Sequence, residues 1–438
     1  MKIASRRSLV AGFVLLISLF GFAQEKPVAL KGGKLLTVTH GVLENGVLLI
    51  QDGKIAALGT AASVKIPKDA RVIDVTGMTI YPGLIDSETH LGLIEISAEN
   101  MTNDMVESSD EITPQMHVYD AFHAESELIP VTRLNGITNV IVAPDNADTL
   151  PGQDCFVQLS GQSATAMLLI RDIAMPLNFT GEQRRNESWD KRKFPSTRMG
   201  LAAQLRQAFL DAQRYAQDRA DYEKKKSVTN SDKEEKGPPS PPKRDLKLEA
   251  LLPYLDGKKS IVLAAEEASD LETAVNLANE FHLKFVLNHI SHSQAVLDYV
   301  ARLKVPVIVG PIYEDPKPDE RYDAVYSLPA QLQKRGVQIA FASYSAHDSR
   351  NLPYQAGFAT AFGLPYDEAL KAITLNPAQI WGVADKLGSL DVGKTANIVV
   401  ANGDPLDLKT DVKEVFIEGR EIPMTSRQTR LRDQYSGH

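Results

Sequence analysis

The chain has 438 residues, of which 43% are hydrophobic and 24% charged, a composition typical of a folded globular protein with a sizeable core. Its formal net charge of −8 argues against a nucleic-acid partner, because phosphate binding requires a basic surface. The single cysteine, Cys155, excludes an intrachain disulfide and a cluster of thiolate ligands. Any metal site must therefore be built from His, Asp and Glu side chains.

Residues 1–23 have the pattern of a cleavable signal peptide, because a basic start precedes an apolar run over residues 9–22 and the small residue Ala23. The run is shorter than the ~20 apolar residues that cross a bilayer. We therefore expect an exported protein, periplasmic or secreted, with no stable membrane span after cleavage. The pair Arg6-Arg7 also fits part of a twin-arginine signal, so the secretory and twin-arginine routes both stay open.

Both ends of the mature chain read as short strands separated by glycine turns. In residues 24–82, apolar residues alternate around Asn45-Gly46 and Asp52-Gly53, which are typical turn pairs. A similar pattern returns in residues 385–425, before a short tail over 426–438. The two ends are predicted to form one composite β-sandwich.

The middle of the chain, residues 83–384, has a different pattern, in which apolar β-rich runs alternate with helical stretches. The runs cover residues 136–144, 260–266, 284–289, 305–311 and 337–343. Continuous apolar strands followed by helices predict a parallel sheet covered on both faces. The fold class is therefore α/β, a (β/α)8 TIM-type barrel with the composite β-sandwich. A doubly wound open sheet is the alternative, but no glycine-rich phosphate loop follows the first strand.

An insertion of about residues 185–245 interrupts the barrel pattern. Residues 195–226 carry Leu, Phe and Tyr at helical spacing and predict a long helix, and the charged, proline-rich stretch after it is predicted to be disordered. The apolar stripe of this helix either packs on the barrel or binds a partner.

Catalytic groups of such a barrel lie at the carboxyl ends of its strands. The first strand ends in Asp86, Glu88 and His90, and the alternation of a strand places Glu88 and His90 on the same side, facing the barrel mouth. Two ligands held by one strand are a good beginning for a divalent metal site.

The stretch "TIYPGLIDSETHLGL" at residues 79–93 is similar to the first-strand motif of the amidohydrolase superfamily. The long block over residues 351–406 resembles the end of the barrel and the sheet that follows it in that superfamily, closest to the imidazolonepropionase-like branch. The resemblance covers nearly the whole mature chain. It implies a hydrolase for carbon-nitrogen bonds other than peptide bonds, of the cyclic amide or imide type, in which a metal-bound water attacks the carbonyl.

The metal ligands implied by the resemblance are only partly present. Where the family has two histidines after the first strand, this sequence has Glu88 and His90. The sixth-strand histidine of the family corresponds to His289 within one residue. The fifth-strand histidine falls on Ala264, which binds nothing, and the eighth-strand aspartate falls on Tyr344.

Two interpretations follow. In the first, an atypical site holds one divalent ion, with zinc expected, and hydrolyses a small-molecule substrate. Its candidate ligands are Glu88, His90, His289 and His292, and its candidate proton carriers are Asp348 and His347. In the second, the metal is absent and the chain is a pseudoenzyme that binds a ligand or a partner, either as a homo-oligomer or paired with an active relative. Each of these histidines also has a purely structural alternative, as a packed side chain or a helix cap.

Overall fold

The structure is a computed structural model that describes residues 26–107, 109–179, 194–229, 240–291, 293–316 and 320–436. The predicted signal peptide, the candidate ligand His292 and much of the predicted disordered stretch lie outside the described residues. Within these ranges no helix is both long and apolar enough to cross a membrane.

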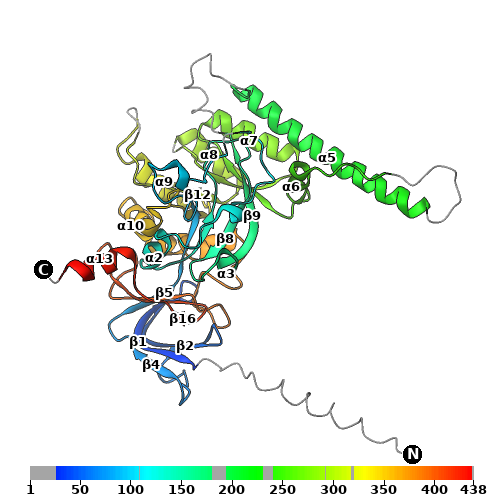
Figure 1. Ribbon diagram of the computed structural model, residues 1–438. Coiled ribbons are helices and arrows are strands. Elements are labelled where there is room, and N and C mark those ends of the chain that lie inside the picture. The colour runs from blue at the N-terminus through cyan, green and yellow to red at the C-terminus, as the bar shows by residue number, and fades with distance from the viewer. Residues whose placement is uncertain are drawn as a thin grey trace, which may run out of the picture.

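The two ends of the chain build one sheet at the base of the molecule (Figure 1). Its strands are β1 (Val28–Leu36), β2 (Val42–Gln51), β3 (Lys54–Thr60), β4 (Arg71–Asp74), β5 (Thr79–Pro82), β14 (Ile398–Ala401), β15 (Val412–Ile417) and β16 (Arg420–Glu421). The order is β16-β15-β14-β5-β1-β2-β3, with β4 also paired to β1. The antiparallel pairing of β5 with β14 joins the two ends of the chain.

Local sequence explains the turns of this sheet. Asp52 and Gly53 both have positive φ angles, of 51° and 74°, and connect β2 to β3 as an Asp-Gly hairpin turn requires. Asn45-Gly46, predicted as a second turn, instead lies inside β2, where the register with β1 shifts and Asn45 has a φ of 51°. The pair makes a bulge in a continuous strand.

The second sheet forms the barrel, in the order β13-β12-β11-β10-β9-β8-β7-β6. Its strands are β6 (Leu84–Thr89), β7 (Ile137–Val142), β8 (Asp154–Gln158), β9 (Leu168–Asn178), β10 (Ser260–Ala264), β11 (Lys284–Asn288), β12 (Val307–Val309) and β13 (Ile339–Phe341). The first and last strands meet where the Tyr344 N–H donates to the Glu88 carbonyl at 3.0 Å. This contact brings the two edges of the sheet together, as the barrel prediction requires.

One strand departs from a regular (β/α)8 pattern. β8 pairs antiparallel with both β7 and β9, while the neighbouring pairs β6-β7, β9-β10 and β10-β11 are parallel. The connection from β8 to β9 covers only residues 159–167 and includes the four-residue helix α3 (Ala164–Met167). A connection this short favours an antiparallel hairpin, because a parallel pair needs a long crossover.

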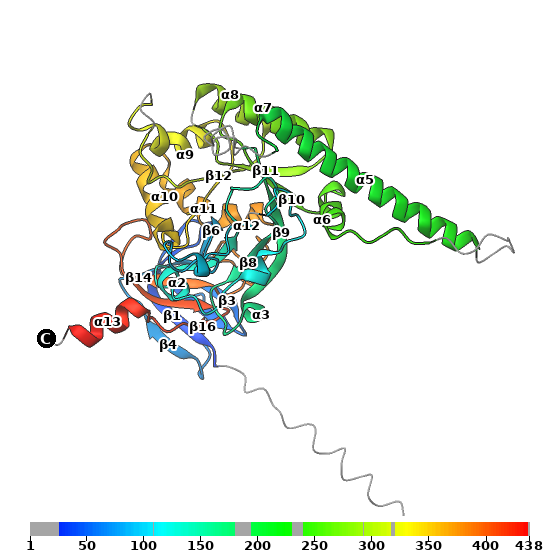
Figure 2. The ribbon, with the colours of Figure 1, turned by 45° about the horizontal axis from the view of Figure 1, so that its top comes forward.

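Most of the helices lie around the barrel, while α13 projects away from it at the C-terminal end of the chain (Figures 1 and 2). Their bounds are η1 (Asn100–Thr102), α1 (Val118–Ala121), α2 (Leu128–Arg133), α5 (Arg198–Thr229), α6 (Leu246–Leu255), α7 (Ala268–Glu280), α8 (Gln294–Leu303), α9 (Ala324–Lys334), η2 (Ser349–Asn351), α10 (Leu352–Ala361), α11 (Tyr366–Ala372), α12 (Leu375–Ile380) and α13 (Arg427–Tyr435). In α7, the buried residues Leu271, Ala274 and Ala278 recur at helical spacing and turn one face to the core.

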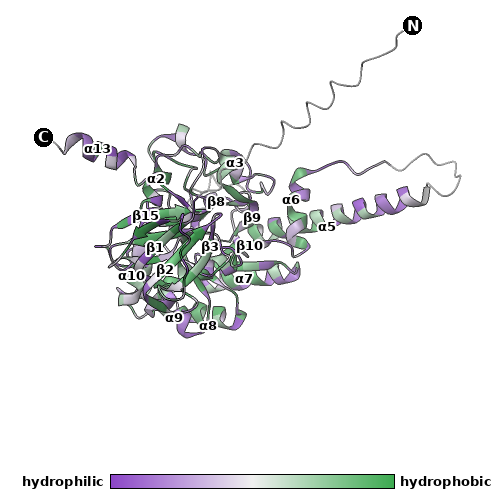
Figure 3. Cartoon of the chain, turned by 90° about the horizontal axis from the view of Figure 1, so that it is seen from below, coloured by the Kyte–Doolittle hydropathy of each residue, from purple (hydrophilic) through white to green (hydrophobic). Residues whose placement is uncertain are grey.

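The predicted long helix is α5, and its two halves differ. Near its start, Leu205 and Phe209 are buried, the Phe209 ring packs 5.1 Å from that of Phe281, and Arg206 pairs with Glu280 at 2.8 Å. Its far half extends away from the barrel (Figures 1 and 2) and is largely hydrophilic (Figure 3). The apolar stripe therefore packs on the barrel at the beginning of the helix.

The inside of the barrel is filled. One side chain from each strand, or from the residue directly after it, contributes to a single apolar cluster: Ile85, Ile141, Phe156, Ala174, Val262, Val286, Ile308 and Ala342. Because side chains of a strand alternate between its faces, residues two positions nearer the mouth point to the same side. This layer is the floor on which the polar residues of the mouth stand.

Candidate functional site

The carboxyl ends of three adjacent strands present amides and an alanine. The register places Asn178 of β9 beside Ala264 of β10, and Ala264 beside Asn288 of β11. Ala264 and Asn288 each lie two residues beyond a member of the barrel floor and therefore face inward. β11 is the sixth strand of the barrel, and the side chain that faces inward at its end is therefore that of Asn288. His289 lies one residue past the strand.

Glu88 of β6 reaches across the mouth to Asn288. It is 3% exposed, and the Asn288 Nδ2 group donates to its Oε2 at 2.9 Å. Burial raises the pKa of Glu88 to about 8, with a further increase from the nearby charges of Asp86 and Asp145, while the hydrogen bond from Asn288 acts against the shift. The carboxyl group is therefore mostly protonated at neutral pH when nothing binds it.

Asp86, also on β6, closes the barrel. It accepts hydrogen bonds from the Ser343 N–H at 3.0 Å, the Ser343 hydroxyl at 2.5 Å and the Ser349 hydroxyl at 2.7 Å. Burial raises the pKa of Asp86 to about 6, and these donors limit the rise. Its oxygens are used to hold β6 against the chain that follows β13.

His90 follows β6 and has one free ring nitrogen. Its Nδ1 lies 2.9 Å from the Ala143 carbonyl oxygen, which can only accept, so Nδ1 carries the proton. The lone pair is therefore on Nε2. This arrangement is typical of histidines that bind metal ions, because a backbone carbonyl fixes the ring and its tautomer.

His289 is close to His90 but engaged otherwise. Its Nε2 forms a short hydrogen bond with the Asn146 amide, and its ring lies 4.3 Å from the Tyr344 ring. Burial and the proximity of His90 lower the pKa of His289 to about 4, so the ring is neutral. A neutral Nε2 that accepts the Asn146 N–H has no lone pair left for a metal ion.

Tyr344 occupies the position at which the resemblance places an aspartate. Its φ is 50°, and its hydroxyl lies 3.4 Å from the Ile308 carbonyl oxygen. Burial and the charges of Glu88 and Asp86 raise the pKa of Tyr344 well above its usual value, and an interaction with Asn288 acts in the opposite direction. The phenol stays neutral and cannot serve as a general base near pH 7.

The two candidate proton carriers lie in the loop before η2 and bond within their surroundings. The His347 Nε2 lies 3.1 Å from the Glu95 carbonyl oxygen. Asp348 is exposed and accepts from the Ser345 hydroxyl and the Asn351 amide, each at 3.1 Å. The hydrogen bonds of both side chains thus stay in this loop or join it to residue 95, and none reaches Glu88.

Sequence reasoning overlooked Asp154, Asn178 and Asn288. Asp154 opens the antiparallel β8, is 2% exposed and faces inward like Phe156, and burial together with the charge of Glu88 raises its pKa well above the usual value. Asn178 and Asn288 end the apolar runs of β9 and β11. A polar residue that ends a buried strand was the available signal, but it becomes specific only when the register is known.

The described side chains do not fit a zinc site. Zinc needs at least three protein ligands at bonding distance, and in the described ranges no three His, Cys, Asp or Glu side chains are grouped to hold a metal ion. Ala264 offers no donor atom, and the lone pair of His289 is used by Asn146. Glu88 and His90 are what remains of the predicted set, and His292 lies outside the described residues.

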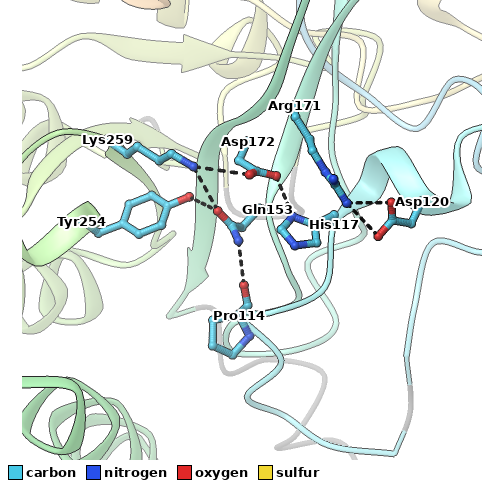
Figure 4. A network of polar contacts seen from close by, with 8 residues as sticks. All are labelled: Pro114, His117, Asp120, Gln153, Arg171, Asp172, Tyr254 and Lys259. Carbon is cyan, nitrogen blue, oxygen red and sulfur yellow. Dashed lines mark hydrogen bonds and ion pairs between the residues drawn. The ribbon is translucent and has the colours of Figure 1, made fainter. Parts of the chain in front are cut away.

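A second polar cluster lies on the outer side of β8 (Figure 4). His117 bonds to Asp172 at 2.6 Å, and Gln153 accepts from Tyr254 at 3.1 Å and from Lys259 at 3.3 Å. Arg171 pairs with Asp120 beside them. The cluster ties the loop before α1 to β9 and to the start of β10, so it supports the wall of the barrel.

Comparison with known proteins indicates which family this chain resembles. Residues 324–422 match the Amidohydrolase family. An amidohydrolase from Thermotoga maritima MSB8 has a similar structure, with a TM-score of 0.79 and 27% identity over 91% of this chain and 100% of that one. The chain therefore has an amidohydrolase fold, and it is similar in sequence to the amidohydrolase superfamily.

Other relatives are similar over different lengths. The amidohydrolase tasK of Hapsidospora irregularis is 25% identical over 396 residues, which are 86% of this chain and 39% of tasK. This chain therefore spans well under half of that relative. An imidazolonepropionase of Geobacillus sp. strain WCH70 is 41% identical over 54 residues, which are 11% of this chain and 13% of that protein. The amidohydrolase fold and the resemblance to imidazolonepropionases agree with the sequence prediction.

Proposed function

We propose that this amidohydrolase-fold chain binds a small polar ligand at its barrel mouth and does not hydrolyse it with a metal-bound water. The observation that carries the proposal is the mutual engagement of Glu88 and Asn288 beside Ala264. The glutamate and the amide bond to each other at 2.9 Å, and the alanine between Asn178 and Asn288 leaves no donor at the place of a ligand.

The remaining chemistry of the mouth supports the same function. A hydrolase needs a base that accepts the proton of the attacking water. Tyr344 is neutral, the hydrogen bonds of Asp86 hold the barrel closed, and Asp348 is held in an exposed loop. What the mouth offers is a set of fixed hydrogen-bonding groups, which suits recognition.

A second candidate function is metal-dependent hydrolysis of cyclic amides or imides, and the free Nε2 of His90 favours it. Glu88 and His90 would have to supply a metal ion with ligands together with His289 or His292. His347 or Asp348 would then have to move the proton. This function requires His289 to give up its bond to Asn146 and the loop before η2 to turn toward the mouth.

A hydrolysis assay separates the two functions. The mature chain is incubated with Zn²⁺, Mn²⁺ or Mg²⁺ and offered hydantoin, dihydrouracil and a panel of dipeptides. We expect no turnover above that of the Glu88→Ala variant with any ion. Turnover that depends on an added ion and disappears in Glu88→Ala would establish the hydrolase instead.

Export and association belong to the same proposal. The signal-like residues 1–23 support export, and N-terminal sequencing of the protein from a cell envelope fraction should begin at residue 24. The chain acts either as a homo-oligomer or paired with an active relative. Homo-oligomerisation and pairing with an active relative are distinguished by light scattering of the chain alone.

A further inference from the structure

Four buried oxygens at the barrel mouth lack a hydrogen-bond donor. They are Glu88 Oε1, Asp154 Oδ1, Asn178 Oδ1 and Asn288 Oδ1, and none has a partner among the described residues. We call these four residues the acceptor ring. Each is at most 3% exposed. A buried acceptor without a donor is unfavourable, so four of them at one end of a barrel indicate a ligand that supplies donors.

The orientation of the two amides is fixed by their other bonds. The Asn288 Nδ2 donates to Glu88, and the Asn178 Nδ2 donates to the Asp148 carbonyl oxygen at 2.7 Å. Turning the Asn178 amide over would place its oxygen against the Asp148 carbonyl oxygen, and turning the Asn288 amide over would place its oxygen against Glu88 once a bound cation ionises that carboxyl group. Both Oδ1 atoms are therefore true acceptors, and the ring presents oxygen on all of its four members.

The charge of the mouth has one sign. The charge of Glu88 acts on Asp154, and the charges of Asp86 and Asp145 act on Glu88. In the described part of the chain, no Lys or Arg is among the groups whose charge acts on Glu88, Asp86 or Asp154. The ionised form of these buried carboxyl groups becomes favourable only when a positive group lies between them.

The residues of the ring favour an organic cation over a single metal ion. Asn178 and Asn288 flank Ala264, which has no donor atom, and no three His, Cys, Asp or Glu side chains of the described ranges are grouped to hold a metal ion. A planar group with several N–H donors can bond to several acceptors at once and matches carboxylates in pairs.

We infer that the acceptor ring binds a small organic molecule through a cationic group with several N–H donors, of the guanidinium or amidinium class. The inference rests on the proposed function, since it names the ligand of a mouth that binds without hydrolysing. Glu88 and Asp154 receive the charge, and the Asn178 and Asn288 oxygens accept the outer N–H groups.

Calorimetric titration with two matched probes tests this assignment. Butylguanidinium and butylurea have the same shape, but only the first is charged and carries N–H donors in place of the urea oxygen. The full mature chain, treated with a chelator, should bind butylguanidinium at least about tenfold more tightly than butylurea. Glu88→Gln and Asn288→Leu should each weaken that binding by at least about tenfold, and Asn288→Asp, which keeps the acceptors, should retain it.

Glu280→Gln is the matched control for Glu88→Gln, because Glu280 is an exposed partner of Arg206, and it should bind as the unmodified chain does. Circular dichroism establishes that each variant is folded, and the isosteric Glu88→Gln keeps the test decisive if Asn288→Leu does not fold. Binding of butylurea or hydantoin without butylguanidinium would overturn the cationic assignment and leave the proposed function standing. The cationic assignment would also be overturned if Mn²⁺, Mg²⁺ or Ca²⁺ bound in a way that requires Glu88 while butylguanidinium did not bind. It would be overturned as well if no probe bound at all. Ion-dependent hydrolysis would instead overturn the proposed function.

Discussion

At the scale of single residues, the mouth is defined by polar groups that share one another's hydrogen bonds. Glu88 and Asn288 pair across the barrel, Asp86 is enclosed by serine hydroxyls, and His289 is held by Asn146. Such groups are costly when buried and persist when their arrangement serves recognition or closure. The chemistry of the mouth therefore fits the selective binding that we propose.

The raised pKa of Glu88 predicts how stability depends on pH. The folded chain holds a proton on Glu88 up to about pH 8, whereas the unfolded chain releases it near the ordinary value of 4.5. The contribution of Glu88 is therefore complete below pH 4.5 and is lost as the pH rises toward 8. Asp86 adds a decrease of the same sign between 3.8 and about 6.

Urea unfolding of the chelator-treated chain at pH 5, 6.5 and 8 measures this effect. The free energy of unfolding should fall between pH 6.5 and 8, and Glu88→Gln should reduce that fall; Asp154, whose pKa burial also raises, contributes with the same sign. Glu280→Gln, on the surface, should leave the pH profile unchanged. A profile for Glu88→Gln that matches the unmodified chain would show that Glu88 is ionised in the folded state.

The closure of the barrel can be tested at Ser343. Ser343→Ala removes a hydroxyl that donates to the buried Asp86 and should lower the free energy of unfolding by about 1–3 kcal/mol. Ser63→Ala, in an exposed turn of the other sheet, should change it by less than about 0.5 kcal/mol. Equal effects of the two substitutions in urea unfolding would contradict a special role for the Asp86 contacts.

At the scale of elements, the strands were predictable where they are continuous and buried. Strands β7, β10, β11, β12 and β13 lie inside the predicted segments, because a continuous run of apolar, β-favouring residues is by itself enough to predict a buried strand. The β8-β9 hairpin was not predicted, since nothing local marks an antiparallel strand among parallel ones. No strand was predicted over Asp154–Gln158, which form β8.

The same limit applies to the site. The motif around Glu88 and His90 could be found from alternation, but the choice between Asn288 and His289 depends on where β11 ends. A difference of one residue moves a side chain to the other face of a strand. Asp154 and Asn178 come from the β8-β9 hairpin, far in sequence from Glu88 and Asn288, and only the register of the barrel brings them to the same mouth.

Helix α5 gives a prediction of its own. Phe209 is buried against Phe281, so Phe209→Ala should cost about 3–5 kcal/mol if the first half of the helix is part of the cooperative core. Leu210→Ala, next to it and 46% exposed, should cost less than about 1 kcal/mol. Hydrogen exchange that protects the start of α5 equally in both variants would contradict this packing.

At the scale of the whole molecule, the two ends of the chain are joined in one sheet that closes under the barrel. Leu30, Leu48, Ile80, Ile398 and Phe416 share one apolar cluster, although more than three hundred residues separate β5 from β14. The barrel therefore rests on strands that come together only when the chain is complete.

Two truncations test this dependence. A chain that ends after residue 397 loses β14, the partner of β5, and should fail to fold, as judged by proteolysis and circular dichroism. A chain that ends after residue 426 loses only α13, which buries no residue within its described length, and should unfold at the same urea concentration as the full chain. A stable barrel in the shorter chain would contradict the shared core.

The most direct test of the central claim compares the metal content of two purified proteins, the unmodified chain and a variant with a restored ligand set. Both are incubated with Zn²⁺ and measured by elemental mass spectrometry. The restored variant combines four substitutions: Glu88→His, Ala264→His, Asn288→His and Tyr344→Asp. We predict essentially no retained zinc in the unmodified chain and about one ion per chain in the variant, since three or four converging ligands suffice for tight binding. About one retained ion in the unmodified chain, lost in Glu88→Ala, would contradict the claim that its mouth binds without a metal.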